Sequence, residues 1–410
     1  MKRLMGQRWF LAIVFVILYK PAMLSQMPQY SSIDTLTNIL KVLISAVIIA
    51  WMFLYYRKAS LFFILLAGFE FWRIICTIYC GANYTSLFLT ISNGLVLALV
   101  TEMALKVDAD ALLDSATAVL GTYVILNLLT ILMFPKGMYE YSNYTENYLF
   151  GYRNNMLMIT LPAMIFACVR SFKYYNRLTI SSIVISAVCV SSVLLAFSAT
   201  SVVGTAILCV IILMAVIGFM PKIFNMATYI IINMAYFFGV IILRVQNYFA
   251  FIIVDVLGRD LTFTGRTTIW DKALEAFVNS PVFGVGEIET KASRDLIGAS
   301  HAHNYYLDLL YKNGVPGFIL FMLVIVICGV ALYKMRDEGK ITFLISGALL
   351  AFSIALQSEA YYNIYQFFPI LALAAFVPYV LPQKDENGNQ IFKERKSIKR
   401  NLHHGKSQIY

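Results

Sequence analysis

Long apolar runs recur along nearly the whole chain, and they constrain the fold more than any other feature. Most are close to the roughly 20 residues that a helix needs to cross a bilayer. They fall near residues 9–25, 33–55, 60–79, 86–106, 115–134, 154–170, 178–197, 201–220, 226–244, 316–333, 341–358 and 364–381. Only 13% of the residues are charged, about half the usual share in a soluble domain. The sequence therefore predicts an all-α polytopic membrane protein with about 12 transmembrane helices.

Basic residues alternate along the chain in a way that sets its orientation. Arginine and lysine collect in the cytoplasmic loops of membrane proteins. Here every second loop is basic, from Lys2, Arg3 and Arg8 at the N-terminus to the tail that follows Pro382. This pattern predicts an even number of spans, with both termini in the cytoplasm. It also accounts for the formal net charge of +10 without a nucleic-acid partner.

One long polar segment, residues 245–315, interrupts the apolar runs between the ninth and tenth spans. It predicts an extracytoplasmic loop that is large enough to carry a site. We therefore divide the chain into a membrane domain over residues 1–382, with this loop as its candidate catalytic part, and a basic cytoplasmic tail over residues 383–410. A shorter outer segment, residues 135–153, carries tyrosines that suit either a membrane-interface belt or sugar stacking.

Two short helices are expected within the large loop. Apolar residues recur with helical spacing over residues 269–278, and Thr268 with Asp271 resembles a capping box at the helix start. A second helix is expected over residues 303–312, closed by Gly314. Both helices are too short and too polar to span a bilayer, so we expect them to lie on the bundle at the membrane surface.

Three arginines on the predicted outer side are candidate ligands of phosphate groups. Arg266 precedes the first loop helix, whose free N–H groups carry a partial positive charge that favours a phosphate or diphosphate. A salt bridge of Arg266 to Asp260 or Asp271 is the alternative. Arg153 and Arg244 lie at the outer ends of the sixth and ninth spans, against the positive-inside bias. Snorkelling to lipid headgroups is the alternative for both.

Histidines and acidic residues supply the remaining candidates. His303, two residues after His301, is suited to accept a proton from a hydroxyl, although a hydrogen bond within the loop is the alternative. The acids nearest in sequence lack zinc-site spacing, so no metal is expected. Glu359, at the outer mouth of the eleventh span, suits contact with sugar hydroxyls or is an ordinary loop acid. Glu70 and Arg73, three residues apart on the third span, predict a structural ion pair.

Short motifs follow one another in order through the large loop. They are Gly265-Arg266 with Trp270, Pro281 with Gly284 and Gly286, His303-Asn304-Tyr305-Tyr306-Leu307, and Gly314 with Gly317. Outside the loop, the segments Arg153-Asn154-Asn155 and Ser198-Ala199-Thr200-Ser201 agree more loosely with the same pattern. The ordered set resembles the O-antigen polymerase and O-antigen ligase superfamily of bacterial surface-polysaccharide assembly.

The resemblance implies a GT-C-like membrane glycosyltransferase at the outer face of the bacterial cytoplasmic membrane. It implies an undecaprenyl-diphosphate-linked oligosaccharide as donor, inversion at the transferred sugar, and neither metal nor other cofactor. It implies catalytic roles for Arg266, His303 and Arg153. Further residues in or near the motifs are expected to bind substrate: Arg244, Asn154, Asn304, Tyr305 and Glu359. Besides membrane lipid, a polysaccharide chain-length regulator is a candidate partner, by family analogy.

Three functions are open at this point. A polymerase would join lipid-linked repeat units into O-antigen or capsular polysaccharide, and a ligase would transfer the glycan to lipid A core or protein. A flippase or transporter of lipid-linked oligosaccharides is the alternative from another class. Transporters place charged substrate residues near the middle of the membrane and often show internal repeats. This chain instead concentrates its polar residues in one outer loop, which favours the polymerase.

Overall fold

The computed structural model describes residues 2–56, 59–82, 85–142, 144–222, 225–245, 265–386, 388 and 390–392. Eight helices in this part of the chain are long and apolar enough to cross a membrane, and three more are apolar but shorter. The longest, α6 (Thr85–Met133), contains non-helical backbone at Asp108, which divides it into two arms. With these arms counted separately, the described residues form twelve apolar helical segments. The predicted polytopic membrane fold is confirmed.

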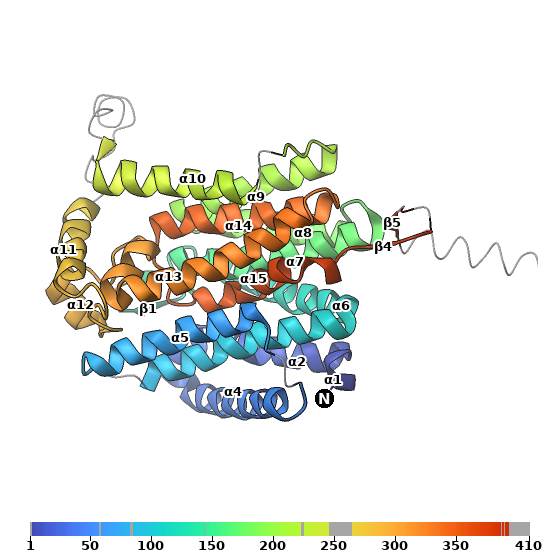
Figure 1. The fold of residues 1–410 in the computed structure, drawn as a ribbon. Coiled ribbons are helices and arrows are strands. Elements are labelled where there is room, and N and C mark those ends of the chain that lie inside the picture. The colour runs from blue at the N-terminus through green and yellow to red at the C-terminus, as the bar shows by residue number, and fades with distance from the viewer. Residues whose placement is uncertain are drawn as a thin grey trace, which may run out of the picture.

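The helices of the bundle run side by side through most of the molecule (Figure 1). In chain order they are α1 (Lys2–Met5), α2 (Arg8–Leu18), α3 (Met23–Gln26), α4 (Ser31–Trp51), α5 (Leu61–Tyr79), α6, α7 (Leu157–Tyr175), α8 (Ile180–Leu195), α9 (Ala199–Ile217), α10 (Met226–Tyr236), α13 (Tyr305–Lys334), α14 (Lys340–Ser358) and α15 (Phe368–Ala375). Short 3-10 or π-helical segments adjoin several of them: η1 (Pro28–Tyr30) and η2 (Met52–Tyr56) flank α4, η3 (Arg153–Met156) precedes α7, η4 (Phe237–Ile242) follows α10, and η7 (Ile364–Phe367) and η8 (Val377–Tyr379) flank α15.

Helices α7 and α14 form the centre of the bundle. The span that contains α7 is 89% buried and that of α14 is 83% buried, whereas no other long span among the described residues exceeds 44%. A helix that is surrounded on all sides must be apolar all round, as the sequence of α7 largely is. Asn154, just before α7, and Glu359, just after α14, are therefore attached to the most firmly packed helices.

Polar elements cover one end of the bundle. Helices α11 (Arg266–Asn279) and α12 (Thr290–Ile297) lie there with a small antiparallel sheet of β1 (Tyr139–Tyr141), β2 (Tyr144–Tyr148) and β3 (Gly151–Tyr152), in the order β1-β2-β3. Figure 1 shows α1 and the hairpin of β4 (Gln383–Lys384) and β5 (Gln390–Ile391) at the opposite end. The described parts of both terminal regions thus lie away from the large loop, as an even number of spans requires.

The large loop differs from the prediction in three respects. Helix α11 begins at Arg266, because Gly265 adopts a φ of +82° and serves as the N-cap. No side chain caps this helix, so the capping box predicted for Thr268 and Asp271 is wrong. Helix α12 is additional to the two helices expected. The helix expected at the surface over residues 303–312 is instead the first part of α13, and it is almost wholly buried.

Packing against α11 explains why the first part of α13 is buried. Leu307 lies in one apolar cluster with Trp270 and Ala273 of α11. The polar residues that make this segment look like a surface helix are paired internally. The Nζ atom of Lys312 lies 2.7 Å from Oδ2 of Asp308, one turn earlier in the helix. A buried charge of this kind is tolerated because it is paired.

Two glycines let residues 281–286 pack directly on α13. Gly284 and Gly314 both adopt positive φ, which residues with a side chain rarely do. A Cβ atom at Gly284 would also lie only 2.4 Å from the carbonyl carbon of Lys312. The N–H of Gly286 donates to that carbonyl group at 2.9 Å. The loop motif Pro281…Gly284…Gly286 therefore has a structural role, which is to hold the loop against the bundle.

A chain of charged residues also fixes the loop to α5. The predicted pair of Glu70 and Arg73 is confirmed, with 2.7 Å between Oε2 and Nη1. Arg73 also lies 2.8 Å from Oε1 of Glu287 in the loop. Lys312 lies 3.6 Å from the other oxygen of Glu287. Removing Arg73 would take away the cation that pairs with the buried Glu70, and leaving such a charge unpaired is strongly destabilising.

Candidate active site

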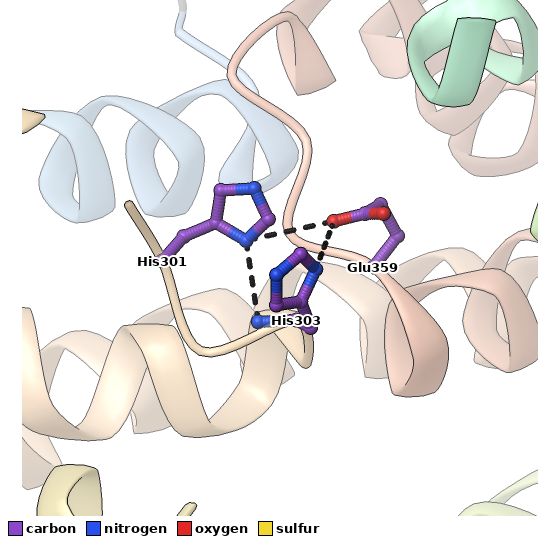
Figure 2. Close-up of side chains that lie close together, drawn as sticks. All are labelled: His301, His303 and Glu359. Atoms are coloured by element: carbon purple, nitrogen blue, oxygen red, sulfur yellow. Dashed lines mark hydrogen bonds and ion pairs between the residues drawn. The ribbon is translucent and has the colours of Figure 1, made fainter. Parts of the chain in front are cut away.

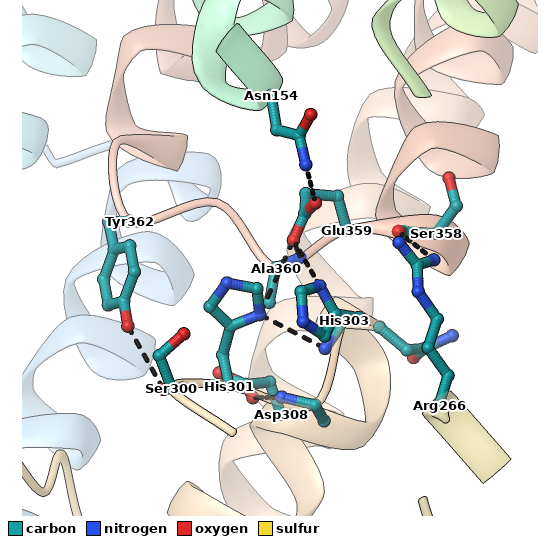
Figure 3. A network of polar contacts seen from close by, with 12 residues as sticks. Asn154, Arg266, Ser300, His301, His303, Asp308, Ser358, Glu359, Ala360 and Tyr362 are labelled. Carbon is teal, nitrogen blue, oxygen red and sulfur yellow. Dashed lines mark hydrogen bonds and ion pairs between the residues drawn. The ribbon is translucent and has the colours of Figure 1, made fainter. Parts of the chain in front are cut away.

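Four segments that are far apart in the sequence meet at the polar end of the bundle. They are the start of α7, the start of α9, the residues before α13 and the residues after α14. Asn154 links the first two, because its Oδ1 accepts a hydrogen bond from Ser198 Oγ at 3.3 Å. Figure 3 shows Asn154, His303 and Glu359 pointing toward one another from their separate segments. The two motifs outside the large loop thus lie beside it in space.

His303 and Glu359 form the centre of this group. The Nδ1 atom of His303 lies 3.2 Å from Oε1 of Glu359 (Figures 2 and 3). The carboxylate also accepts hydrogen bonds from Asn154 Nδ2 at 2.9 Å and from the N–H of Ala360 at 3.1 Å. With a proton on Nδ1 directed at the carboxylate, the Nε2 atom of His303 is left as a proton acceptor.

Glu359 is only 2% exposed, yet its surroundings keep it ionised. Burial alone would raise the pKa of this carboxyl group. The hydrogen bond from His303, together with the electrostatic effects of His301, His303 and Arg266, instead lowers that pKa to about 2. Glu359 is therefore a carboxylate across the physiological pH range. Its oxygens accept hydrogen bonds from the protein itself. Contact with sugar hydroxyls, one of the two roles considered from the sequence, stays a prediction.

The backbone of His303 is held in an uncommon conformation. Its φ is +50°, in the left-handed region that side chains disfavour. The preceding residue, Ala302, is fixed on both sides. Its N–H donates to Oδ1 of Asp308 at 2.8 Å, and its carbonyl accepts from Nε1 of Trp270 at 3.0 Å. Trp270, which belongs to the ordered motifs of the large loop, thus helps to fix the backbone next to His303.

His301 completes this arrangement. Its Nδ1 accepts a hydrogen bond from the N–H of His303 at 3.2 Å. Burial lowers the pKa of His301 to about 4, and the nearby Glu359 carboxylate offsets only part of that effect. His301 is therefore neutral near pH 7. In the neutral ring, Nδ1 is the acceptor and Nε2 carries the proton.

Among the residues that the structure describes, the same three side chains form a group that could hold a metal ion. His301, His303 and Glu359 each offer one ligand atom, and these atoms lie within 4.8 Å of one another (Figure 2). Two histidines and a carboxylate are a common ligand set for zinc. The sequence-based analysis missed this grouping because Glu359 is 56 residues from His303. In the structure the Nδ1 atoms of His301 and His303 and the Oε1 atom of Glu359 take part in the hydrogen bonds described above.

Arg266 lies on the other side of His303 from Tyr362 (Figure 3). It is the first residue of α11, and its Nη1 atom donates to the carbonyl of Ser358 at 2.9 Å. This contact places the guanidinium group beside Glu359, the next residue in the chain. The arrangement combines a cation with the free N–H groups at a helix start, as expected for an anion site.

The other two arginines are paired elsewhere. Arg153 lies 3.3 Å from Oε1 of Glu146 in β2, and its side chain is about a third exposed. Arg244 is paired with Asp271 and also donates to the carbonyl of Thr267 at 3.3 Å. The salt bridge considered for Arg266 with Asp271 is thus made by Arg244. Asp260, the other partner considered, lies outside the described residues.

Two further residues that the sequence predicts to bind substrate are buried directly after His303 in the chain. Asn304 is fully buried and serves as the N-cap of α13, because its Oδ1 accepts from the N–H of Leu307 at 2.9 Å. Its Nδ2 donates to the carbonyl of Gln357 at 2.8 Å. Tyr305 is 6% exposed and packs edge-on against Phe321. Both residues are buried, and neither lines the polar cavity beside His303.

A cavity of about 390 Å³ lies beside His303 and Glu359. The β-sheet, α3, the start of α7 and the residues around His301 and Tyr362 line it. A second groove of about 240 Å³ lies between α10 and helices α13 and α14. This groove is lined mainly by apolar residues and includes Gln357, two residues before Glu359. The two hollows have different chemistry, one rich in hydrogen-bonding groups and one apolar.

Comparison with known proteins gives two findings. Residues 184–322 match the family model described as O-antigen ligase. A stretch of 88 residues is 33% identical to the exopolysaccharide production protein ExoQ of Rhizobium meliloti (strain 1021), which covers 18% of this chain and 20% of that protein. The chain therefore spans about a fifth of the length of this relative in the match. The family match includes Arg266, His301 and His303, whereas Asn154 and Glu359 lie outside it.

Proposed function

Because this chain is a member of the superfamily of O-antigen ligases and polymerases, whose members are glycan-processing enzymes, we propose that it is a polysaccharide polymerase. It joins undecaprenyl-diphosphate-linked oligosaccharide repeat units into O-antigen or capsular polysaccharide. The observation that carries the proposal is the pairing of His303 with the buried Glu359 beside a polar cavity, with Arg266 on the opposite side. A base and a cation on two sides of one centre suit sugar transfer from a diphosphate.

The reaction is a displacement at the anomeric carbon of the donor sugar. A hydroxyl oxygen of the acceptor sugar attacks that carbon and forms the new glycosidic bond. The bond from the anomeric carbon to the diphosphate oxygen breaks, and undecaprenyl diphosphate leaves with its electron pair. The hydroxyl proton passes to Nε2 of His303, while Glu359 stabilises the imidazolium that results. Attack opposite the leaving group inverts the configuration.

Arg266 and the start of α11 stabilise the negative charge that grows on the leaving diphosphate. Cations and N–H groups that are already in place supply this stabilisation without a metal. Arg153 and Arg244 are each paired with a carboxylate on a side chain that is at least one third exposed. Exposed ion pairs contribute little stability. An arriving diphosphate can therefore replace Asp271 as the partner of Arg244, while Arg153 adds its positive charge from the side of Tyr152.

The apolar groove suits the lipid part of the donor. Phe237, Phe318 and Met322 line it, and it lies beside α14, whose last residue accepts the hydrogen bond from Arg266. A polyprenyl chain in the groove would therefore place its diphosphate near Arg266. This arrangement supports a donor that enters from the membrane, with the glycan held at the polar end of the bundle.

The enzyme acts at the outer face of the cytoplasmic membrane, with both termini inside the cell. The support is the basic residues at the terminal end of the bundle, where Lys2, Arg3 and Arg8 begin the chain. A membrane-anchored regulator of chain length is the proposed protein partner, by analogy with the family.

A ligase is the second candidate, because the matching family model is itself described as O-antigen ligase. The two functions share the donor and the displacement step, and they differ in the acceptor. A ligase transfers the glycan to lipid A core or to protein, whereas a polymerase transfers it to another repeat unit. The identity of the acceptor therefore distinguishes a polymerase from a ligase.

Reconstitution tests the proposal. The purified protein in nanodiscs receives lipid-linked repeat units extracted from its host, with EDTA present, and products are separated on a gel. We expect a ladder of polymers that is absent with His303→Ala. Adding lipid A core separates the alternatives. A single transfer product that appears only with that acceptor would replace polymerase by ligase, and no product with either acceptor would contradict both.

A further inference from the structure

The cavity beside His303 has a lining that identifies its ligand. Four tyrosines contribute to it, namely Tyr141, Tyr144, Tyr152 and Tyr362. Five side-chain amides also line it, namely Gln26, Asn147, Asn154, Asn155 and Asn363. Tyrosine offers a rigid flat surface for packing with little loss of conformational freedom. Each amide both donates and accepts hydrogen bonds. The C–H face of a sugar ring and its hydroxyl groups match these two kinds of group.

The charge of the described lining is neutral to acidic. Its remaining residues are small, apolar or uncharged, apart from the two histidines and the carboxylate of Glu359. Phosphate groups are bound by arginine, lysine and free backbone N–H groups. Such groups meet at Arg266, on the other side of His303 from Tyr362 (Figure 3). The guanidinium group of Arg153 lies 5.9 Å from the ring centre of Tyr152, but it is paired with Glu146 and is not part of the lining. The cavity therefore suits an uncharged ligand.

The rings and amides are already placed for contact. Tyr144 and Tyr152 pack with their ring centres 4.3 Å apart, on neighbouring parts of the sheet. Tyr362 is held by a hydrogen bond from its hydroxyl to the carbonyl of Ser300 at 3.2 Å. Asn155 follows directly on Asn154, which bonds to Glu359. Cavities of roughly 300–1,000 Å³ hold drug-sized ligands. At about 390 Å³ this cavity has room for the terminal part of a glycan.

We propose that this cavity binds the acceptor, and that the acceptor is the non-reducing end of an uncharged glycan. One of its hydroxyl groups then faces His303, while the donor diphosphate lies on the Arg266 side. This inference rests on the proposed function, because it assigns the acceptor of that same reaction. An uncharged glycan differs from the phosphorylated core lipid that a ligase uses as acceptor. The phosphate groups of that lipid would need cations in the cavity.

The test uses an acceptor without lipid or phosphate. Mild acid releases the oligosaccharide from the lipid-linked repeat units, and a fluorophore is attached to its reducing end. The reconstituted protein receives this labelled glycan with intact lipid-linked donor. We expect elongation of the label in the wild type. In Tyr144→Ala and Asn155→Ala, the KM for the labelled glycan should rise about tenfold, with kcat changed by less than about threefold. Tyr333→Ala, an exposed tyrosine at the opposite end, is the control.

The outcomes separate this inference from the proposed function. A lower kcat with unchanged KM in both cavity variants would contradict acceptor binding in the cavity. Polymerisation of lipid-linked units without elongation of the labelled glycan would also contradict it, while the polymerase assignment stands. Transfer only to phosphorylated lipid A core oligosaccharide would overturn both. Thermal melting of each variant shows whether a loss reflects unfolding, and Tyr144→Phe, which retains the ring, should restore most of the binding.

Discussion

The Nδ1 atom of His303 lies 3.2 Å from Oε1 of Glu359, although 56 residues separate the two in the chain. Their positions are set by the bundle, because one residue lies just before α13 and the other directly follows α14. The carboxylate is fixed by Asn154 at the start of a third helix. A base whose orientation depends on three helices has little freedom to turn, which is what proton transfer at a defined hydroxyl requires.

Replacing the carboxylate tests the role of this pair. Glu359→Gln removes the charge that stabilises a protonated His303, and it places an NH₂ group opposite either Asn154 or His303. We expect kcat to fall by about 10²–10⁴, with a smaller change in the KM for donor. Initial rates of polymer formation measure this. Glu338→Gln is the control, because Glu338 pairs with Lys384 at the other end of the bundle. A rate close to wild type would show that His303 does not depend on Glu359.

Arg266 is expected to act on the leaving group. Loss of a charge-stabilising group of this kind costs about 2.7–4 kcal/mol of barrier, or about 10²–10³ in kcat. Arg266→Ala should show this loss, and Arg266→Lys should recover only part of it, since lysine lacks the planar fork of donors. Arg294→Ala, an exposed arginine on α12, provides the comparison. Equal activity of Arg266→Ala and Arg294→Ala would remove Arg266 from the mechanism.

His301 should make the folded protein sensitive to acid. Its pKa is lowered by burial from the ordinary 6.5 to about 4. Between these values the unfolded chain binds more protons at this site than the folded protein, so stability falls as the pH drops from 6.5 to 4. The free energy of unfolding that this site loses over that range is at most roughly 3 kcal/mol.

The matched variant is His301→Asn, whose side-chain oxygen can still accept from the N–H of His303. Its thermal unfolding temperature in nanodiscs should change less than that of the wild type between pH 7 and pH 4. The same decrease in both proteins would mean that another group controls the acid sensitivity.

Two glycines in the large loop should respond very differently to alanine. Gly284 and Gly298 both have positive φ, so each substitution carries backbone strain of about 1 kcal/mol. At Gly284 the new Cβ would also meet backbone at 2.4 Å, whereas at Gly298 the nearest atom is the end of the Lys272 side chain at 3.9 Å. We expect Gly284→Ala to destabilise the loop and abolish activity, and Gly298→Ala to retain most of both. Limited proteolysis with the activity assay compares them, and equal tolerance would refute the close packing of this loop.

The sequence predicted the membrane fold well because each span carries its own apolar signal. The charge pair Glu70–Arg73 could also be predicted, since its spacing on one helix brings the two together. The burial of the first part of α13 could not be predicted. Lys312 and Asp308 have the composition of surface residues, and only the structure shows that they pair with each other. Helix α11 begins before the position predicted from the sequence, because a glycine N-cap leaves only a weak signal in the sequence.

The sequence indicates part of the candidate site. Local motifs indicated His303 and Arg266 as candidates, and their position at helix starts was readable from the chain. The partner of His303 was not, because Glu359 approaches it only through packing of α13 against α14. Asn304 and Tyr305 belong to the same motif as His303, yet they face the interior and support it. A motif therefore marks a segment of the site without showing which of its side chains reach the substrate.

Single-turnover transfer by His303→Gln, measured with EDTA present and donor saturating, tests the central claim most directly. Glutamine can still form hydrogen bonds at this position but cannot take the hydroxyl proton. The account predicts that donor still binds, while the rate of glycosidic bond formation falls by about 10²–10⁴. Transfer at a rate near that of the wild type would contradict His303 as the base. Abolition of wild-type transfer by EDTA, with recovery on adding zinc, would contradict the metal-independent mechanism and make His301, His303 and Glu359 metal ligands instead.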